Sequence, residues 1–93
     1  MIAVAGSTKR FNATITISGT LTDPGTLTLK IKEYGQATVT YTYAGAQITK
    51  TSTGVYYKDV VLTYAGKTIY QWVTTGTAAD LVEGTIDVVP SLI

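Results

Sequence analysis

Apolar and polar residues alternate along most of this 93-residue chain, and that period of two constrains its fold more than any other feature. Between residues 10 and 19, the apolar side chains on one strand face are Phe11, Ala13, Ile15 and Ile17. Between residues 26 and 33 they are Leu27, Leu29 and Ile31. Strands with one apolar and one polar face are typical of antiparallel sheets that are solvated on one side. We therefore predict an all-β protein.

Turn residues interrupt these segments at short intervals. Asp23-Pro24-Gly25 predicts a tight turn, because proline presets φ and glycine accepts the positive φ that follows. Further loops are marked by Gly35, Gly45, Gly54 and Gly66. Other strands are predicted at 36–44, 47–51 and 84–89, with a single helical turn over 77–82. About seven short strands at this spacing indicate a sandwich or a small barrel, and the lack of a long closing strand favours the sandwich.

Composition restricts both the size and the chemistry of the protein. A chain of this length forms one domain, residues 1–93. It has no cysteine and no histidine, which removes the thiol nucleophile and the commonest acid–base group and metal ligand near neutral pH. Seven basic residues against six acidic ones create no field that attracts nucleic acid. No apolar run approaches the roughly 20 residues of a membrane span. We expect no nucleic-acid or membrane partner.

The segment 54–76 predicts two successive strands, joined by a turn at Ala65-Gly66, with Trp72 on the second strand. The motifs in and after it are Tyr70-x-Trp72, Thr75-Gly76, Glu83-Gly84-Thr85 and Pro90-Ser91. Through these motifs, residues 54–91 resemble the small immunoglobulin-like β-sandwich structural proteins of tailed bacteriophages. The chain departs from that family at Thr68 and Ile86, where larger aromatic residues are common. The resemblance implies an immunoglobulin-like antiparallel sandwich of about seven strands.

The strand faces also predict which residues form the core. The expected core residues are Phe11, Ile15, Ile17, Leu27, Leu29, Ile31, Tyr56, Val60, Leu62, Tyr70, Trp72, Ile86 and Val88. Tyr56 is expected to bury its ring and to direct its hydroxyl to the backbone. Packing in the core is the expectation for Tyr70 and Trp72, and a sugar-stacking platform is the alternative.

Candidate contact residues are apolar or aromatic side chains that such a sandwich leaves outside. They are Ile2, Val4, Tyr41, Tyr43, Tyr57, Val61, Leu92 and Ile93. Tyr41 and Tyr43 share a strand face that fits the core and an interface equally well. The segment 2–4 either forms an added edge strand or docks on a neighbouring subunit. The end of the chain, 92–93, either folds onto the core or docks in the same way.

No acidic residues are spaced so as to pair two carboxylates across a cleft or to gather the oxygen ligands of calcium. We expect no enzyme activity and no metal or other cofactor. The resemblance implies a virion structural protein, made in the host cytoplasm. We expect a capsid decoration or cement subunit that binds the major capsid protein through a tyrosine-bearing sheet face and its apolar ends. The alternatives are a neck or tail accessory protein and a carbohydrate-binding adhesion module. For a shell protein, a homotrimer is the expected oligomer.

Overall fold

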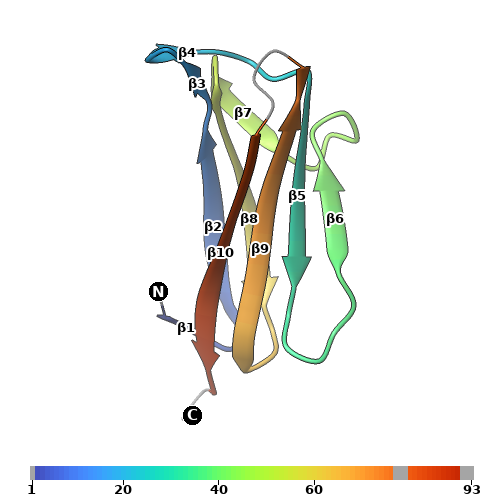
Figure 1. Ribbon diagram of the computed structural model, residues 1–93. Coiled ribbons are helices and arrows are strands. Elements are labelled where there is room, and N and C mark those ends of the chain that lie inside the picture. Colours follow the sequence, from blue (N-terminus) through green and yellow to red (C-terminus); the bar gives the residue numbers. More distant parts are fainter. Residues whose placement is uncertain (1, 77–79, 91–93) are drawn as a thin grey trace.

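The computed structural model describes residues 2–76 and 80–90, which form a two-layered β-sandwich (Figure 1). The larger layer has the order β1-β10-β9-β5-β6, with bounds Ile2–Val4, Asp80–Val89, Gly66–Thr75, Thr26–Lys32 and Val39–Thr42. The smaller layer has the order β2-β8-β7, with bounds Ser7–Thr14, Val55–Leu62 and Thr49–Ser52. A separate hairpin consists of β3, Thr16–Ile17, and β4, Thr20–Leu21. The predicted all-β class is confirmed, while the immunoglobulin-like assignment stays a prediction.

β9 is the central strand of the larger layer, and it pairs antiparallel with β5 on one side and β10 on the other. Its register places Trp72 between Leu29 of β5 and Val82 of β10. The turn predicted at Ala65-Gly66 joins β8 to β9. The φ of Gly66 is 119°, a backbone conformation that residues other than glycine rarely adopt. Because side chains alternate along a strand, every second residue of β9 faces the smaller layer.

The facing sides of the two layers form one hydrophobic core. The predicted core residues that are buried are Phe11, Leu27, Leu29, Ile31, Tyr56, Val60, Leu62, Trp72, Ile86 and Val88. Ile15 and Tyr70 are partly buried and pack against this core, and Ala13 and Ile48 belong to it as well. Trp72 is only 5% exposed, so a sugar-stacking platform built on Trp72 and Tyr70 is not available.

The prediction that Ile17 lies in the core is wrong. The expected continuous strand over 10–19 ends at Thr14, and Ile17 belongs to the β3–β4 hairpin, which projects from the upper left of the sandwich in Figure 1. Ser18 and Gly19 both have positive φ, as a two-residue type I′ hairpin turn requires. The hairpin pairs with neither layer, so Ile17 is 37% exposed.

Other boundaries also differ from the sequence-based expectation. The strand expected at 36–44 is shorter, Val39–Thr42, and the last strand begins at Asp80 instead of residue 84. The helical turn expected over 77–82 is wrong for residues 80–82, which are strand, and its first three residues lie outside the described part. The described residues contain ten strands and not about seven, because β1, β3 and β4 are short additions. Within the described ranges there is no helix of the length and hydrophobicity needed to cross a membrane.

Thr68 is a fully buried polar residue of the core. It is 0% exposed, and its hydroxyl has no hydrogen-bond partner among the described residues. It stands opposite Ile86 of β10. A buried hydroxyl without a partner destabilises the folded state.

We therefore expect Thr68→Val to raise the free energy of unfolding by about 1–2 kcal/mol, because valine has nearly the same shape and no hydroxyl to desolvate. Thr85→Val is the matched control on the exposed face of β10, and we expect it to change stability by less than about 0.5 kcal/mol. Urea unfolding of both variants measures this difference. A clear loss of stability in Thr68→Val would show that the hydroxyl is satisfied.

Candidate functional site

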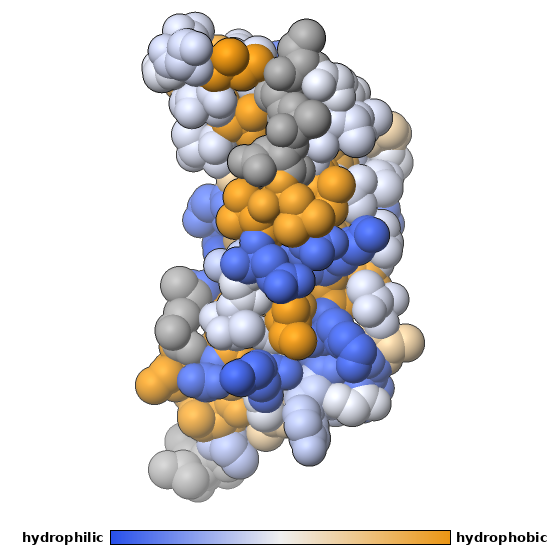
Figure 2. Space-filling model, viewed as in Figure 1, coloured by the Kyte–Doolittle hydropathy of each residue, from blue (hydrophilic) through white to orange (hydrophobic). Residues whose placement is uncertain are grey.

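Apolar side chains gather on the outer face of the larger layer, at its β1 edge. β1 runs parallel to the end of β10, with Ile2 opposite Asp87 and Val4 opposite Val89. The exposed fractions of Ile2, Val4 and Val89 are 72%, 47% and 39%. In Figure 2 apolar surface is visible at the lower left, where β1 lies in Figure 1. We name Ile2, Val4 and Val89 the terminal patch.

The edge strand expected at residues 2–4 is therefore present, and it keeps two predicted contact residues exposed instead of folding them away. The other terminal contact residues, Leu92 and Ile93, lie outside the described part of the chain.

Tyr41 and Tyr43, which fitted either core or interface, extend the core at the β6 edge. Tyr41 is partly buried against the core, and the Lys58 ammonium lies 4.9 Å from its ring centroid. Tyr43 follows β6 and is 42% exposed. Its ring meets the buried ring of Tyr56 edge-on, with centroids 5.3 Å apart. Tyr41 therefore contributes to the core, whereas Tyr43 contacts Tyr56 and keeps an exposed part.

Tyr57 and Val61 point outward from β8, on the far face of the smaller layer. The Arg10 guanidinium lies 3.9 Å from the Tyr57 ring centroid and donates two hydrogen bonds to Asp59, at 2.8 and 3.1 Å. These bonds lower the pKa of Asp59 and raise that of Arg10. Arg10 thus covers part of the Tyr57 ring, whereas Val61 remains 53% exposed.

The predicted contact residues consequently do not form one surface. β1 and β6 are the opposite edges of the larger layer, and Tyr57 and Val61 belong to the other layer. Tyr41 lies on β6 of the larger layer and Tyr57 on β8 of the smaller layer, so these tyrosines do not share one sheet face. A tyrosine-bearing face as the binding surface stays a prediction. In the terminal patch, exposed apolar side chains lie together on one face, whereas Val61 is exposed on the other layer.

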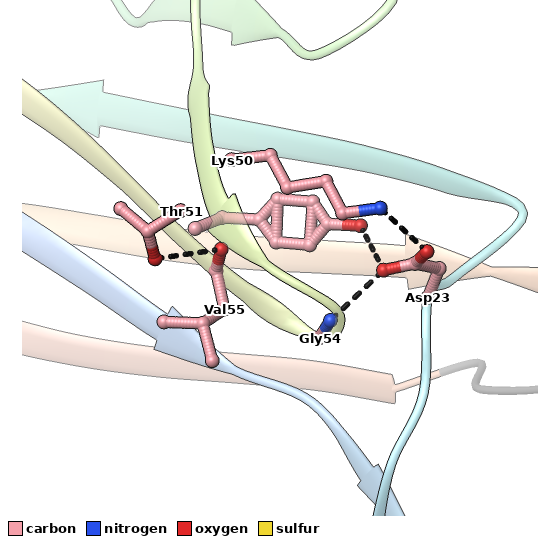
Figure 3. Close-up of polar contacts among 6 residues, drawn as sticks. Asp23, Lys50, Thr51, Gly54 and Val55 are labelled. Atoms are coloured by element: carbon pink, nitrogen blue, oxygen red, sulfur yellow. Dashed lines mark hydrogen bonds and ion pairs between the residues drawn. The ribbon is translucent and has the colours of Figure 1, made fainter.

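Asp23 is the most strongly anchored polar group near the loops at the other end of the sandwich. Its Oδ2 accepts a hydrogen bond from Lys50 Nζ at 2.7 Å, and its Oδ1 accepts from the Gly54 amide and the Tyr56 hydroxyl, both at 2.8 Å (Figure 3). These bonds tie the β4–β5 connection to the β7–β8 hairpin. We name Asp23, Lys50, Gly54 and Tyr56 the Asp23 cluster.

The electrostatics of the Asp23 cluster stabilise the ionised carboxylate. Hydrogen bonds from Lys50, then from the Gly54 amide and Tyr56, lower the pKa of Asp23 to about 2. Burial of Tyr56, reinforced by its bond to Asp23, raises the pKa of the phenol to about 12. Both groups thus keep one protonation state near neutral pH, which suits a structural clamp and not proton transfer.

Sequence reasoning found the turn at Asp23 but not this cluster. Tyr56 was expected to bond to backbone, and the structure instead directs its hydroxyl to a carboxylate 33 positions earlier in the chain. Gly54 has a φ of 73°, and a Cβ there would lie 2.7 Å from the Ile15 carbonyl oxygen. The one sequence signal for this contact was Asp23 at the start of the Asp23-Pro24-Gly25 turn, because aspartate side chains at turns commonly accept hydrogen bonds from backbone amides.

Two exposed tyrosines at the opposite end were also missed. Tyr34 follows β5 and is 67% exposed, and Tyr64 precedes β9 and is 44% exposed. Glu33 Oε1 accepts hydrogen bonds from the amides of Thr63 and Tyr64, at 2.8 and 3.3 Å, which joins the two loops. Tyr34 lies directly against Gly66, where any Cβ would collide with it.

The described acidic residues form no centre for metal chemistry. No three of the acidic side chains in the described ranges come close enough together to hold a metal ion. Glu83 is engaged instead by Gln71, whose Nε2 donates to it at 3.3 Å.

Comparisons with known proteins identify the fold and not the function. No protein-family profile matches the sequence, and no curated protein matches it. A crystal structure of a candidate glycoside hydrolase from Bacteroides vulgatus is similar, with a TM-score of 0.66 and 16% identity. The similarity covers 97% of this chain but only 16% of that chain. The same sandwich therefore occurs there as a small part of a much larger protein, and at this identity the likeness concerns the fold alone.

The Asp23 cluster predicts how stability depends on acid. Because the folded pKa of Asp23, about 2, lies below the unfolded value of about 3.9, its contribution is present above pH 4 and disappears as pH falls toward 2. We expect Asp23→Asn to melt at a lower temperature than the natural chain at pH 7, and the two curves to converge near pH 2.

Tyr56→Phe is the matched control, because it removes one hydroxyl donor and leaves the charge pair with Lys50 in place. We expect it to cost about 1 kcal/mol at pH 7. A gap between Asp23→Asn and the natural chain that stays constant from pH 7 to pH 2 would show that the carboxylate charge contributes nothing.

Proposed function

We propose that this chain is a non-catalytic β-sandwich module that binds another protein through the terminal patch. The observation that carries the proposal is the exposure of Ile2 and Val4 on an edge strand, next to Val89. Apolar side chains that gather at one place, and not singly over a surface, mark sites where proteins meet. The surrounding charge is low, with seven basic and six acidic residues in the chain, so burial of apolar area is the main source of affinity.

On the sequence resemblance, we further propose that the partner is the major capsid protein of a tailed phage and that this chain decorates the shell. A patch of three side chains gives a weak single contact. Many symmetric copies, or a trimer, would raise the effective concentration at each remaining site and stabilise the shell. A neck or tail accessory protein would use the terminal patch in the same way against a different virion subunit.

The test is co-sedimentation of the full chain with phage capsids assembled without it. We expect the double variant Ile2→Asp and Val4→Asp to bind at least about tenfold more weakly, because two carboxylates would be desolvated in the contact. Thr40→Asp, on the exposed part of β6, adds one carboxylate at the opposite edge and should bind like the natural chain. Binding of the natural chain should change little between 0.1 and 1 M salt, about the range in which exposed charges are screened.

Failure of the natural chain to sediment with capsids would overturn the virion proposal. Equal binding by the double variant would overturn the role of the terminal patch while leaving a virion role through another surface.

A carbohydrate-binding module is the second candidate function, favoured by the exposed rings of Tyr34 and Tyr64. Sugar rings stack on exposed aromatic faces, and the ring of Tyr34 lies against Gly66 with 67% of the residue exposed. The similar fold within a candidate glycoside hydrolase is compatible with this reading, because such a protein acts on glycosides.

We expect any glycan binding to be abolished by Tyr34→Ala and retained by Tyr34→Phe, which keeps the ring. A glycan panel followed by titration of the natural chain and both variants provides the measurement. Because Tyr34 is 67% exposed, neither substitution should affect folding by more than about 0.5 kcal/mol. Absence of binding across the panel would eliminate this candidate.

A further inference from the structure

β1 pairs with β10 only at its end, and no strand of the described residues pairs with the outer edge of β10 at Glu83 and Thr85. β10 pairs with β9 from Asp80 to Val88, but β1 reaches it only at 87–89. Figure 1 shows β1 as a short strand beside the lower end of β10. Among the described residues, no strand lies along the outer edge of β10 from residue 80 to residue 86.

The direction of the backbone groups along this edge follows from one hydrogen bond. The carbonyl of Val89 accepts from the Ala5 amide at 2.8 Å, so the peptide groups of Val89 point away from β9. Strand geometry repeats every two residues, and the amide and carbonyl of Thr85 and Glu83 therefore point to the same open side. These groups can pair with the backbone of a further strand.

The gap between the two layers opens on the same side. β2 is the edge strand of the smaller layer, and it borders a groove lined by Lys9, Phe11, Tyr70, Trp72 and Ile86. The rings of Phe11 and Tyr70 meet there edge-on, with centroids 5.2 Å apart.

Two core-facing positions of β10 fail to close this groove. Val82 is paired with Trp72, which places it on the core side, yet it is 52% exposed. Gly84 has no side chain, and the Tyr70 hydroxyl lies so close to it that any Cβ would collide. An apolar residue on the inner face of a sandwich that remains half exposed indicates that the layer is incomplete at this point.

Two basic residues, Lys9 and Arg10, line the groove. Lys9 is partly buried on the same face of β2 as Phe11, and neither ion pair of the described residues includes it. The neighbouring Arg10 is held by Asp59. An occupant with a carboxylate near Lys9 would therefore gain an opposite charge in a partly desolvated place.

We propose that the open edge of β10 and this groove bind an extended segment of another polypeptide. The segment adds a strand beside β10, with backbone hydrogen bonds to Glu83 and Thr85. Its alternate apolar side chains cover Val82 and the ring of Tyr70, and one acidic side chain pairs with Lys9. The amides and carbonyls of Glu83 and Thr85 are spaced to match the backbone of another strand, which favours a peptide over a sugar as the ligand. This rests on the protein-binding function proposed above, but it uses a surface separate from the terminal patch.

The test is a titration of the isotope-labelled full chain, followed by the amide signals of Glu83 and Thr85 and the indole signal of Trp72. The probe is a capped nine-residue peptide that alternates threonine and valine and has one aspartate in place of a valine. We expect these three signals to shift to saturation. A peptide with lysine in place of the aspartate should bind about tenfold more weakly at low salt. A peptide N-methylated at alternate residues should not bind, since it cannot pair with a strand.

Thr85→Pro is the decisive variant, because it deletes an edge amide that does not bond to β9. It should abolish binding of the aspartate peptide, whereas Thr85→Val, which keeps the amide, should bind like the natural chain. Lys9→Glu gives an independent readout that leaves the edge intact, and it should reverse the preference in favour of the lysine peptide.

Several results would overturn the proposal: no binding of the aspartate peptide at 1 mM, unchanged preference in Lys9→Glu, or shifts confined to Ile2 and Val4. The Ile2→Asp and Val4→Asp variant should still bind the peptide. Loss of capsid binding with intact peptide binding therefore separates the terminal patch from the groove.

Discussion

The structure depends on burying one face of β9 against the smaller layer. The chain has no cysteine, so no disulfide adds to the stability that apolar burial provides. Trp72 and Thr68 of β9 are buried with Leu29 of β5 and Ile86 of β10, and the registers of the two neighbouring strands bring these side chains together. A small domain buries little apolar surface, so an unpartnered hydroxyl in its core lowers the free energy of unfolding by a measurable amount. The remaining polar contacts position loops around this core.

The Asp23 cluster shows how one loop end is fixed. A carboxylate that accepts from an ammonium, an amide and a phenol holds the β4–β5 connection against the β7–β8 hairpin. At the opposite end, the Glu33 carboxylate accepts hydrogen bonds from two backbone amides and so joins the loops that carry Tyr34 and Tyr64. Both carboxylates are used for structure.

Apolar side chains are buried to different extents around the sandwich. The proposed interactions involve those that remain exposed. At the β6 edge, Tyr41 packs against the core and the ring of Tyr43 contacts Tyr56. At the β10 edge, β1 pairs only with residues 87–89. Ile2 and Val4 remain outside on β1 itself, and Val82 remains exposed on the inner side of β10. One side of the molecule therefore combines an apolar patch, an open strand edge and a groove between the layers, all suited to another polypeptide chain.

Alternation by itself determined the all-β class, the strands around Leu29, Val60 and Trp72, and most of the core, because a period of two records which face of a strand is buried. It did not determine that Ile17 leaves the core, since Ser18 and Gly19 turn the chain back into a hairpin outside both layers. Nor did it determine the partner of Tyr56 or the short reach of β1 along β10. Those features join residues far apart in sequence, so only the tertiary structure, through strand pairing within a layer and contacts between the loops, decided them.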